Sequence, residues 1–391
     1  MKYFYILIIA LTTVLSATPA LAQDDSYSLN TQNPVLTDNS QTIFLSGRLQ
    51  SGWAGSYYNG SDPNIDQLEN QFFINRAYLT LSGLLNEDIA FRIRLDCIGE
   101  TDESNISLKN AYLRISNISY LGLTSRLYLG IVGSIWETFE TEIWKYQVLR
   151  RISAGMFGYI EESEVGANYY MNFNDNRVSV RVGLWNGDYQ KYSTLGFGTE
   201  VNEQFTDDNL SAGFFILFNQ GGYLDKNSTY DGLNFAVGGM LNNKPGDDDE
   251  ANSGYRLFSG LYYILNRTNF EKLLTIGISC GYINGHKREN EFSNLIIDNT
   301  YYGDAFIIVN LALFSAEARH FELIFRLDYN YDGRKGEGYL EPNDDIHQGA
   351  ITIALAYKPY SWLSVIPAFM GDYVDIGRDV NLIGIWFELR Y

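Results

Sequence analysis

The sequence predicts an all-β fold, a transmembrane antiparallel β-barrel of about 16 strands. Three observations carry this prediction. Apolar and polar residues alternate over segments of about ten residues, the length that a tilted strand needs to cross a membrane. The connections between these segments are alternately short and long, and the chain ends on an alternating strand whose last residue is aromatic.

The last eleven residues, 381–391, carry the clearest alternation. Successive side chains of a strand point to opposite faces. One face therefore carries Ile383, Ile385, Phe387, Leu389 and Tyr391, and the other carries Gly384, Trp386, Glu388 and Arg390. An apolar row that reaches the last residue is typical of a strand that faces lipid and closes a barrel. The alternative from these residues alone is the edge strand of a soluble β-sandwich.

The N-terminal residues predict export. Lys2 is followed by an apolar run over 3–15 and by a small-x-small cleavage pattern at Ala20 to Ala22. Residues 1–22 are therefore interpreted as a cleaved signal peptide, 23–41 as a disordered periplasmic lead-in, and 42–391 as the outer-membrane barrel. No later stretch has the roughly 18 consecutive apolar residues of a transmembrane helix.

The composition agrees with many short strands. The chain has 30 Tyr, 23 Phe and 36 Gly but 7 Pro. Two Cys in an exported chain of this length exclude a disulfide scaffold.

The net charge of −19 argues against nucleic acid as a partner. The acids cluster in expected loops at 207–208, 247–250 and 344–345, and we interpret them as a solvated surface. The alternative is that divalent cations bridge these loops to lipopolysaccharide.

We expect strands at 42–58, 70–84, 88–98, 107–117, 124–132, 164–174, 176–186, 208–219, 231–242, 253–266, 273–284, 301–314, 318–331, 347–358, 361–373 and 380–391. The connections after odd-numbered strands are mostly long and those after even-numbered strands mostly short, with 220–230 as the exception. Outer-membrane barrels show this parity because their periplasmic turns are short and their extracellular loops long.

The longest connection, 133–163, is the third extracellular loop of such a barrel. It contains the aromatic residues Trp136, Phe139, Trp144 and Phe157 among Glu137, Glu140, Glu142, Lys145, Arg150 and Arg151. Aromatic anchors in a long loop indicate packing, so we expect the loop to fold inward and to form the constriction. Arg150 and Arg151 are the eyelet candidates. The alternative is an outward loop that contacts a neighbouring subunit.

The polar face of the strands is rich in arginine. The expected pore-lining or anion-binding residues are Arg48, Arg76, Arg92, Arg94, Arg114, Arg126, Arg177, Arg181 and Arg326, with Arg256 in the same row. Arginine stays charged and offers a planar fork of donors to carboxylate or phosphate. The alternative is that these arginines pair with neighbouring carboxylates.

Catalytic patterns are weak. Gly277 to Gly281 matches Gly-x-Ser-x-Gly but lies inside an alternating strand, whereas a nucleophile elbow needs a sharp strand-to-helix turn. The three histidines, His286, His320 and His347, lack metal-ligand spacing. We expect no enzyme activity, no catalytic residue, no cofactor and no metal site.

Several segments resemble the phosphate-selective porin O and P family of bacterial outer-membrane porins. The segment 73–83 (FINRAYLTLSG) is similar to the second-strand motif of that family, 90–96 (AFRIRLD) to the third strand, and 108–113 with 127–130 to the fourth and fifth. The resemblance covers about 43–187. It implies a trimeric, sixteen-stranded anion porin in which Arg76 matches the motif arginine. Asn75 stands where a second arginine is common, and 131–134 lacks the family's lysine.

The expected function is an outer-membrane porin for passive diffusion of small anionic or neutral solutes, with anion and possible phosphate preference. The expected partners are outer-membrane lipid, lipopolysaccharide and two further copies of the chain in a homotrimer. The alternative is a structural or adhesive surface barrel with acidic loops and no open pore.

Overall fold

The architecture comes from a computed structural model of the chain. The structure describes residues 34–38, 41–59, 69–99, 104–118, 124–150, 163–173, 177–186, 210–220, 231–243, 254–267, 271–284, 286–290, 293–297, 299–332, 334–335, 346–374 and 379–390. No helix within these ranges is long and apolar enough to cross a membrane.

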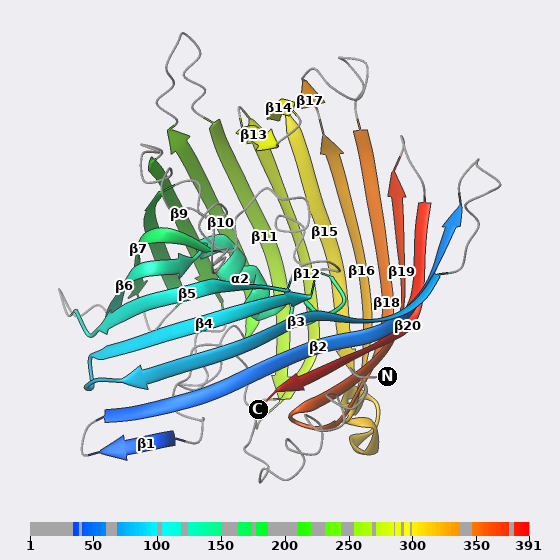
Figure 1. The fold of residues 1–391 in the computed structure, drawn as a ribbon, viewed down its shortest axis with the longest axis horizontal. Helices are drawn as coiled ribbons and strands as arrows, with labels where there is room; N and C mark the ends of the chain where they lie inside the picture. Colours follow the sequence, from blue (N-terminus) through cyan, green and yellow to red (C-terminus); the bar gives the residue numbers. More distant parts are fainter. Residues whose placement is uncertain are drawn as a thin grey trace.

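Sixteen antiparallel strands form a closed barrel, as the alternation predicts (Figure 1). The strands are β2 (Gln41–Asn59), β3 (Glu69–Leu84), β4 (Ile89–Gly99), β5 (Ser104–Ser116), β6 (Thr124–Gly133), β7 (Ser163–Phe173), β8 (Val178–Asn186), β9 (Leu210–Asn219), β10 (Gly232–Asn243), β11 (Gly254–Arg267), β12 (Glu271–Asn284), β15 (Thr300–Asn310), β16 (Phe321–Asp332), β18 (Ile346–Tyr360), β19 (Leu363–Val374) and β20 (Asp379–Arg390). Each pairs with the next, and β20 pairs with β2 from Arg48↔Arg390 to Asn59↔Asp379. The first and last strands therefore close the ring.

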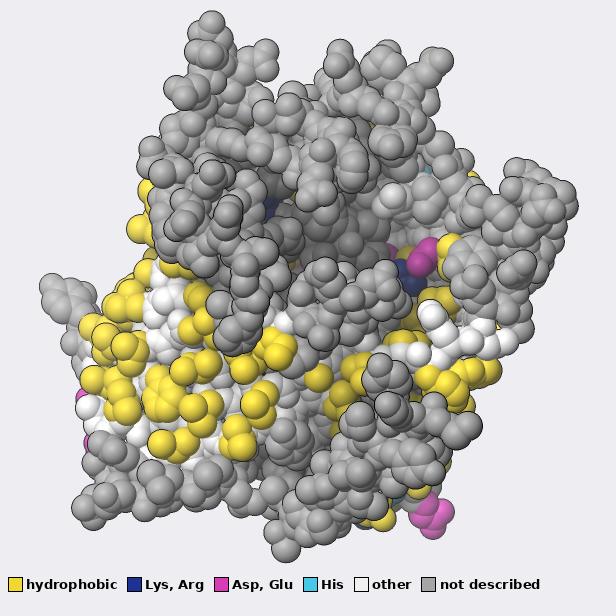
Figure 2. All heavy atoms as spheres, in the orientation of Figure 1, with side chains coloured by type: hydrophobic (Ala, Val, Ile, Leu, Met, Phe, Trp, Pro, Cys, Tyr) yellow, Lys and Arg dark blue, Asp and Glu magenta, His cyan; other side chains and the backbone are white. Residues whose placement is uncertain are grey.

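Alternation sorts the side chains between the two faces of the wall. Ile383, Ile385 and Phe387 of β20 point outward and are exposed, while Trp386 and Glu388 point inward and are buried. Figure 2 shows the resulting patch of hydrophobic side chains over part of the outer face. A soluble sandwich would bury this row in a second sheet, so the outward apolar face is the signature of a barrel in lipid.

An aromatic girdle lies on the outer face at the end of the long connections. Tyr282 contacts Tyr255 and Tyr301 with ring centroids 5.8 and 4.9 Å apart, and Tyr331 continues the row to His347 at 5.2 Å. Amphipathic rings in such a band suit the boundary between hydrocarbon and head groups.

The turn between β15 and β16 is longer than the sequence predicts. The strand expected over 301–314 ends at Asn310, whose side-chain oxygen accepts from the backbone N–H of Ala312 and caps the 3-10 helix η3 (Leu311–Leu313). A second short helix, η4 (Ala316–Ala318), follows, so β16 begins at Phe321 and not at residue 318. The apolar run 311–314 continues the strand pattern, and the pattern alone therefore conceals the turn.

Short strands also occur outside the ring. β1 (Pro34–Asp38) forms a hairpin with the start of β2, so these five residues of the expected lead-in are a strand. Residues 1–33 lie outside the described residues. β13 (His286–Asn290), β14 (Ser293–Ile297) and β17 (Arg334–Lys335) form a separate small sheet between two long connections.

The third long connection enters the barrel, as the sequence predicts. Helix α2 (Ile135–Ile143) starts directly after β6 and lies inside the ring of strands (Figure 1). Its apolar residues Ile135, Trp136, Phe139 and Ile143 are buried. We call residues 134–150 the inner loop.

Candidate functional site

The inner loop follows the inside of the wall from β8 round to β19. Its residues contact side chains of β9, β11, β12, β15, β16, β18 and β19. The ring order places β3 to β6 on the other side of the lumen. The site is therefore a channel with two unlike sides, the inner loop and the arc from β3 to β6.

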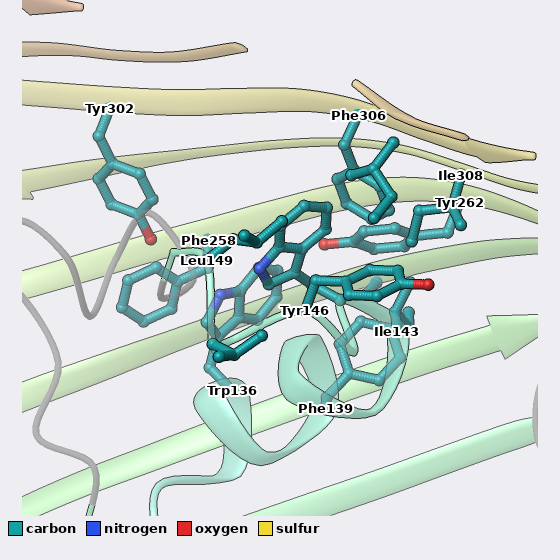
Figure 3. Packing of buried hydrophobic residues seen from close by; sticks show 14 of the residues in the cluster. Trp136, Phe139, Ile143, Tyr146, Leu149, Phe258, Tyr262, Tyr302, Phe306 and Ile308 are labelled. Atoms are coloured by element: carbon teal, nitrogen blue, oxygen red, sulfur yellow. The ribbon is translucent and has the colours of Figure 1, made fainter. Parts of the chain in front are cut away.

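Aromatic packing seats α2 on the wall (Figure 3). Trp136 stacks on Phe258 of β11 at 5.2 Å between ring centroids and meets Phe215 of β9 edge-on at 5.8 Å. Phe139 contacts Phe215 at 4.8 Å and Tyr262 of β11 at 5.4 Å. Each such pair adds about 0.5–1.5 kcal/mol to the free energy gained from burial. The predicted constriction residue Trp136 thus fixes the loop and does not face the water path.

Glu322 of β16 tethers the middle of the loop. Its carboxylate accepts from Lys145 Nζ at 2.9 Å, from Lys358 Nζ at 3.1 Å and from the Tyr146 hydroxyl. Burial, together with the charge of Glu322, holds the pKa of Tyr146 well above its usual range, so this hydroxyl stays a donor. Lys145, a predicted constriction residue, is therefore bound to the wall.

Arg150 anchors the end of the described loop. Its Nη2 lies 2.6 Å from Asp372 Oδ1 of β19, its Nε donates to Thr352 of β18 at 3.2 Å, and Asp328 of β16 is 4.0 Å away. Arg150, an eyelet candidate from the sequence, is therefore bound to the wall. Its partner in that expectation, Arg151, lies outside the described residues.

Arg326 lies beneath the loop. It is 1% exposed, contacts Asp328 at 2.6 Å and Asp304 at 3.6 Å, and its guanidinium carbon lies 4.6 Å from the ring centre of Trp144. The sequence places it in the water-facing arginine row. The structure covers it with Trp144, and it belongs to the seat of the inner loop.

The opposite arc carries a group of cations that we call the basic wall: Arg76, Arg92, Arg94, Lys109, Arg114 and Arg126. Tyr78 lies among them. Arg76 Nη1 and Lys109 Nζ donate to its hydroxyl oxygen at 2.7 and 3.2 Å, and Arg94 lies 5.3 Å over its ring. Among the described side chains of β3 to β6, Asp96 is the acid that faces this group. Its Oδ2 lies 3.9 Å from Arg76 Nη1. The arginines predicted on β3 to β6 thus lie on the same side of the lumen, spread along the height of the wall.

The remaining predicted arginines lie elsewhere. Arg48 forms an ion pair with Glu388, which Arg390 also contacts at 2.8 Å. Arg181 is buried between the rings of Tyr170 and Phe215, at 4.7 and 4.9 Å. Arg177 is exposed in the turn before β8 and so lies at the rim. Glu137 is half-buried on α2.

Sequence reasoning missed several contributors. Lys109 lies at a β-bulge between the pairs Arg94↔Asn110 and Leu95↔Leu108, which breaks the alternation that would have assigned it to the lumen. Tyr146 and Lys358 meet Glu322 across 176 and 36 residues of sequence, and no local signal reports such pairs. Among the described residues, no three His, Cys, Asp or Glu side chains gather in a way that could hold a metal ion.

Comparison with known proteins gives similarity of structure alone. No protein-family model matches the chain, and no curated protein matches its sequence. A loop-deletion variant of OmpT, an outer membrane protein of Vibrio cholerae, matches with a TM-score of 0.57 at 11% identity over 90% of this chain and 100% of that one.

Two further solved structures agree. OprB of Pseudomonas putida gives a TM-score of 0.59 at 11% identity over 89% of this chain and 94% of that one. The outer membrane channel DcaP of Acinetobacter baumannii gives 0.55 at 11% identity over 91% and 99%. The chain therefore has the fold of the sixteen-stranded outer-membrane β-barrels.

Proposed function

We propose that the protein is a porin through which small solutes diffuse passively, with anions preferred over cations. The supporting observation is the unequal distribution of charged side chains around the lumen. On the loop side, Glu322 and Asp372 contact cations of the inner loop, and Asp304 and Asp328 contact Arg326. On the opposite side, the six cations of the basic wall accompany one described acid, Asp96.

The inner loop thus screens the acidic side and leaves the lumen with a positive side. Guanidinium groups keep their charge at any physiological pH and bind oxyanions through paired N–H donors. A series of such groups provides several weak sites, which conduction requires because a solute must both enter and leave. The protein catalyses no reaction in this proposal.

The direct test is the reversal potential of the purified mature protein in a planar bilayer under a potassium chloride gradient. We expect chloride preference at about 0.1 M salt, where the Debye length is about 10 Å, and weaker preference near 1 M. The double variant Arg94→Ala with Arg114→Ala should reduce the preference, and Arg177→Ala at the rim is the matched control.

Potassium preference would contradict the proposal and would point to Glu137 and Glu142 of α2. Absence of any single-channel current would favour the alternative, a structural or adhesive barrel without an open pore.

Phosphate as a preferred solute is a finer proposal that rests on the resemblance to the phosphate-selective porins. Arg76 supports it, while Asn75 and the missing basic residue after Gly130 favour a broader range of solutes. Micromolar phosphate that blocks the chloride current would support phosphate selectivity. A linear, unsaturated current in phosphate would reject it.

A homotrimer in outer-membrane lipid is the proposed assembly. One solved OmpT structure of Vibrio cholerae, with a TM-score of 0.55 at 11% identity, is described as a trimer form. Cross-linking of the protein in native membranes tests the assembly, and a monomer would reject it. The acidic loops at 207–208, 247–250 and 344–345, interpreted as a solvated surface with cation bridging to lipopolysaccharide as the alternative, lie outside the described residues.

A further inference from the structure

A buried carboxyl of the inner loop takes no part in the proposed selectivity. Glu140 lies on the wall-facing side of α2 and is 4% exposed. Its Oε1 accepts from the hydroxyl of Tyr262 at 3.0 Å, and no described group donates to Oε2. The side chains around it, which include Trp144, Phe306 and Arg326, enclose a space with no room for a water molecule.

The three charged groups nearest to Glu140 sum to a negative value. Arg326 is shared between Asp328 at 2.6 Å and Asp304 at 3.6 Å, and Asp304 lies beside Glu140. Two carboxylates and one guanidinium give a net charge of −1. An ionised Glu140 would make it −2 in a dry, apolar surrounding, where an unpaired charge is costly.

The neutral donors of the remaining elements do not change this balance. Ser279 of β12 lies close to Glu140, but its hydroxyl proton goes to Asp304 Oδ2 at 2.8 Å. Tyr262 of β11 supplies one neutral hydrogen bond, and Tyr302 of β15 adds an uncharged phenol nearby. Two further cations lie beyond these groups: Arg256 of β11 acts on Tyr302, and Lys272 of β12 donates to the backbone oxygen of Glu142 at 3.4 Å.

We propose that Glu140 is a protonation-dependent lock of the inner loop. Its neutral carboxyl seats α2 against the wall, and loss of the proton drives α2 away from Asp304. Because α2 already lies inside the barrel, movement away from the wall is movement into the lumen. The current should therefore fall and closures should become frequent when Glu140 ionises.

The direction and range of the pH dependence follow from the same surroundings. Burial, with a further contribution from Asp304, raises the pKa of Glu140 to about 8. A carboxyl whose pKa is raised on docking favours the docked loop most at acidic pH. That contribution is lost as the pH rises through about 8, and the open channel is the low-pH state.

The first readout is single-channel conductance of the purified protein between pH 6 and 10. The wild type should show a conductance decrease with a midpoint near pH 8, and Glu140→Gln should keep the low-pH conductance over the whole range. Asp304→Asn removes the neighbouring charge and should shift the midpoint to lower pH. Glu137→Gln, at a half-buried position of the same helix, is the matched control and should titrate like the wild type.

The second readout does not depend on conduction, because the proposal uses the porin function only to report on the loop. Infrared difference spectra between pH 6 and 10 should show that the wild type loses a protonated carboxyl band. The spectra of Glu140→Gln should lack this band at both pH values. A wild-type protein that loses this band but carries no current would contradict the proposed porin function and would still support the proposed role of Glu140. A wild type without the band, or a Glu140→Gln variant that titrates like the wild type, would overturn the lock.

Discussion

At the scale of single residues, one carboxylate decides how the inner loop is held. Glu322 is buried and accepts from two lysines and a tyrosine, one lysine and the tyrosine from the loop and the other lysine from the wall. Asn310 adds a longer contact of 3.5 Å from the turn beside η3. Four parts of the chain thus meet at one side chain, and each has its own polar group to satisfy there.

Replacement of Glu322 by Gln should therefore destabilise the barrel and release the loop. Removing one partner of a buried ion pair leaves the others uncompensated and costs about 3–5 kcal/mol. Urea unfolding from lipid vesicles, followed by tryptophan fluorescence, measures this change. Glu317→Gln, on an exposed residue of η4, is the control and should change the free energy of unfolding by less than about 0.5 kcal/mol. Equal stability of the two variants would contradict the role given to Glu322.

The residue pattern could predict which face of a strand each side chain lies on, but not which side chain it contacts. Alternation assigned Glu388 and Arg326 to the inward face correctly, because a strand has a fixed period of two. Whether Arg326 faces water or Trp144 depends on which loop crosses it, and Arg150 finds Asp372 across 222 residues. Such pairs require the register of several strands at once, which one sequence does not contain.

At the scale of elements, the inner loop is an amphipathic segment whose core partner is the barrel wall. The aromatic residues of 133–163 predicted its inward fold correctly, since free loops rarely keep buried anchors. The sequence could not predict that the anchors Trp136 and Phe139 would point away from the channel. That orientation follows from the inward aromatics Phe215, Phe258 and Tyr262 on β9 and β11, which offer the matching surface.

Truncation of Phe139 to Ala should loosen α2 without unfolding the barrel. Phe139 is fully buried between Phe215 and Tyr262, and loss of such a side chain costs about 3–5 kcal/mol. Because the cost falls on docking of the loop, we expect larger fluctuations of the single-channel current. The shift in gel mobility on heating, which reports the folded barrel, should be unchanged. Thr138→Ala, half-buried one position away, should conduct like the wild type. Steady current through Phe139→Ala would show that the tethers alone hold the loop.

At the scale of the whole molecule, closure of the ring depends on the meeting of its first and last strands. β20 pairs with β2 over twelve residues of each strand, and Gly384 lies opposite Ala54. A Cβ on Gly384 would collide with the backbone oxygen of Trp53 and lie 2.8 Å from Ala54 Cα. The glycine of the terminal motif is therefore required for the close approach of these strands.

The variant Gly384→Ala should assemble poorly. The collision is with backbone atoms that cannot rotate away, and overpacking of this kind costs about 1–3 kcal/mol at the last step of closure. The yield of folded barrel in vesicles measures it. Gly349→Ala is the matched control, because its Cβ would have Asp328 O at 3.9 Å as its nearest neighbour. Equal yields would show that closure tolerates a wider strand separation.

The path of the inner loop also sets an order of events in folding. The loop leaves β6 early in the chain, yet its partners lie on strands as late as β19, 222 residues away. Long-range contacts form slowly because the intervening chain must first be ordered. Strands β8 to β19 must therefore be in place before the loop finds its seat. A newly made barrel should pass through a wide, leaky form whose lifetime is the docking time of the loop.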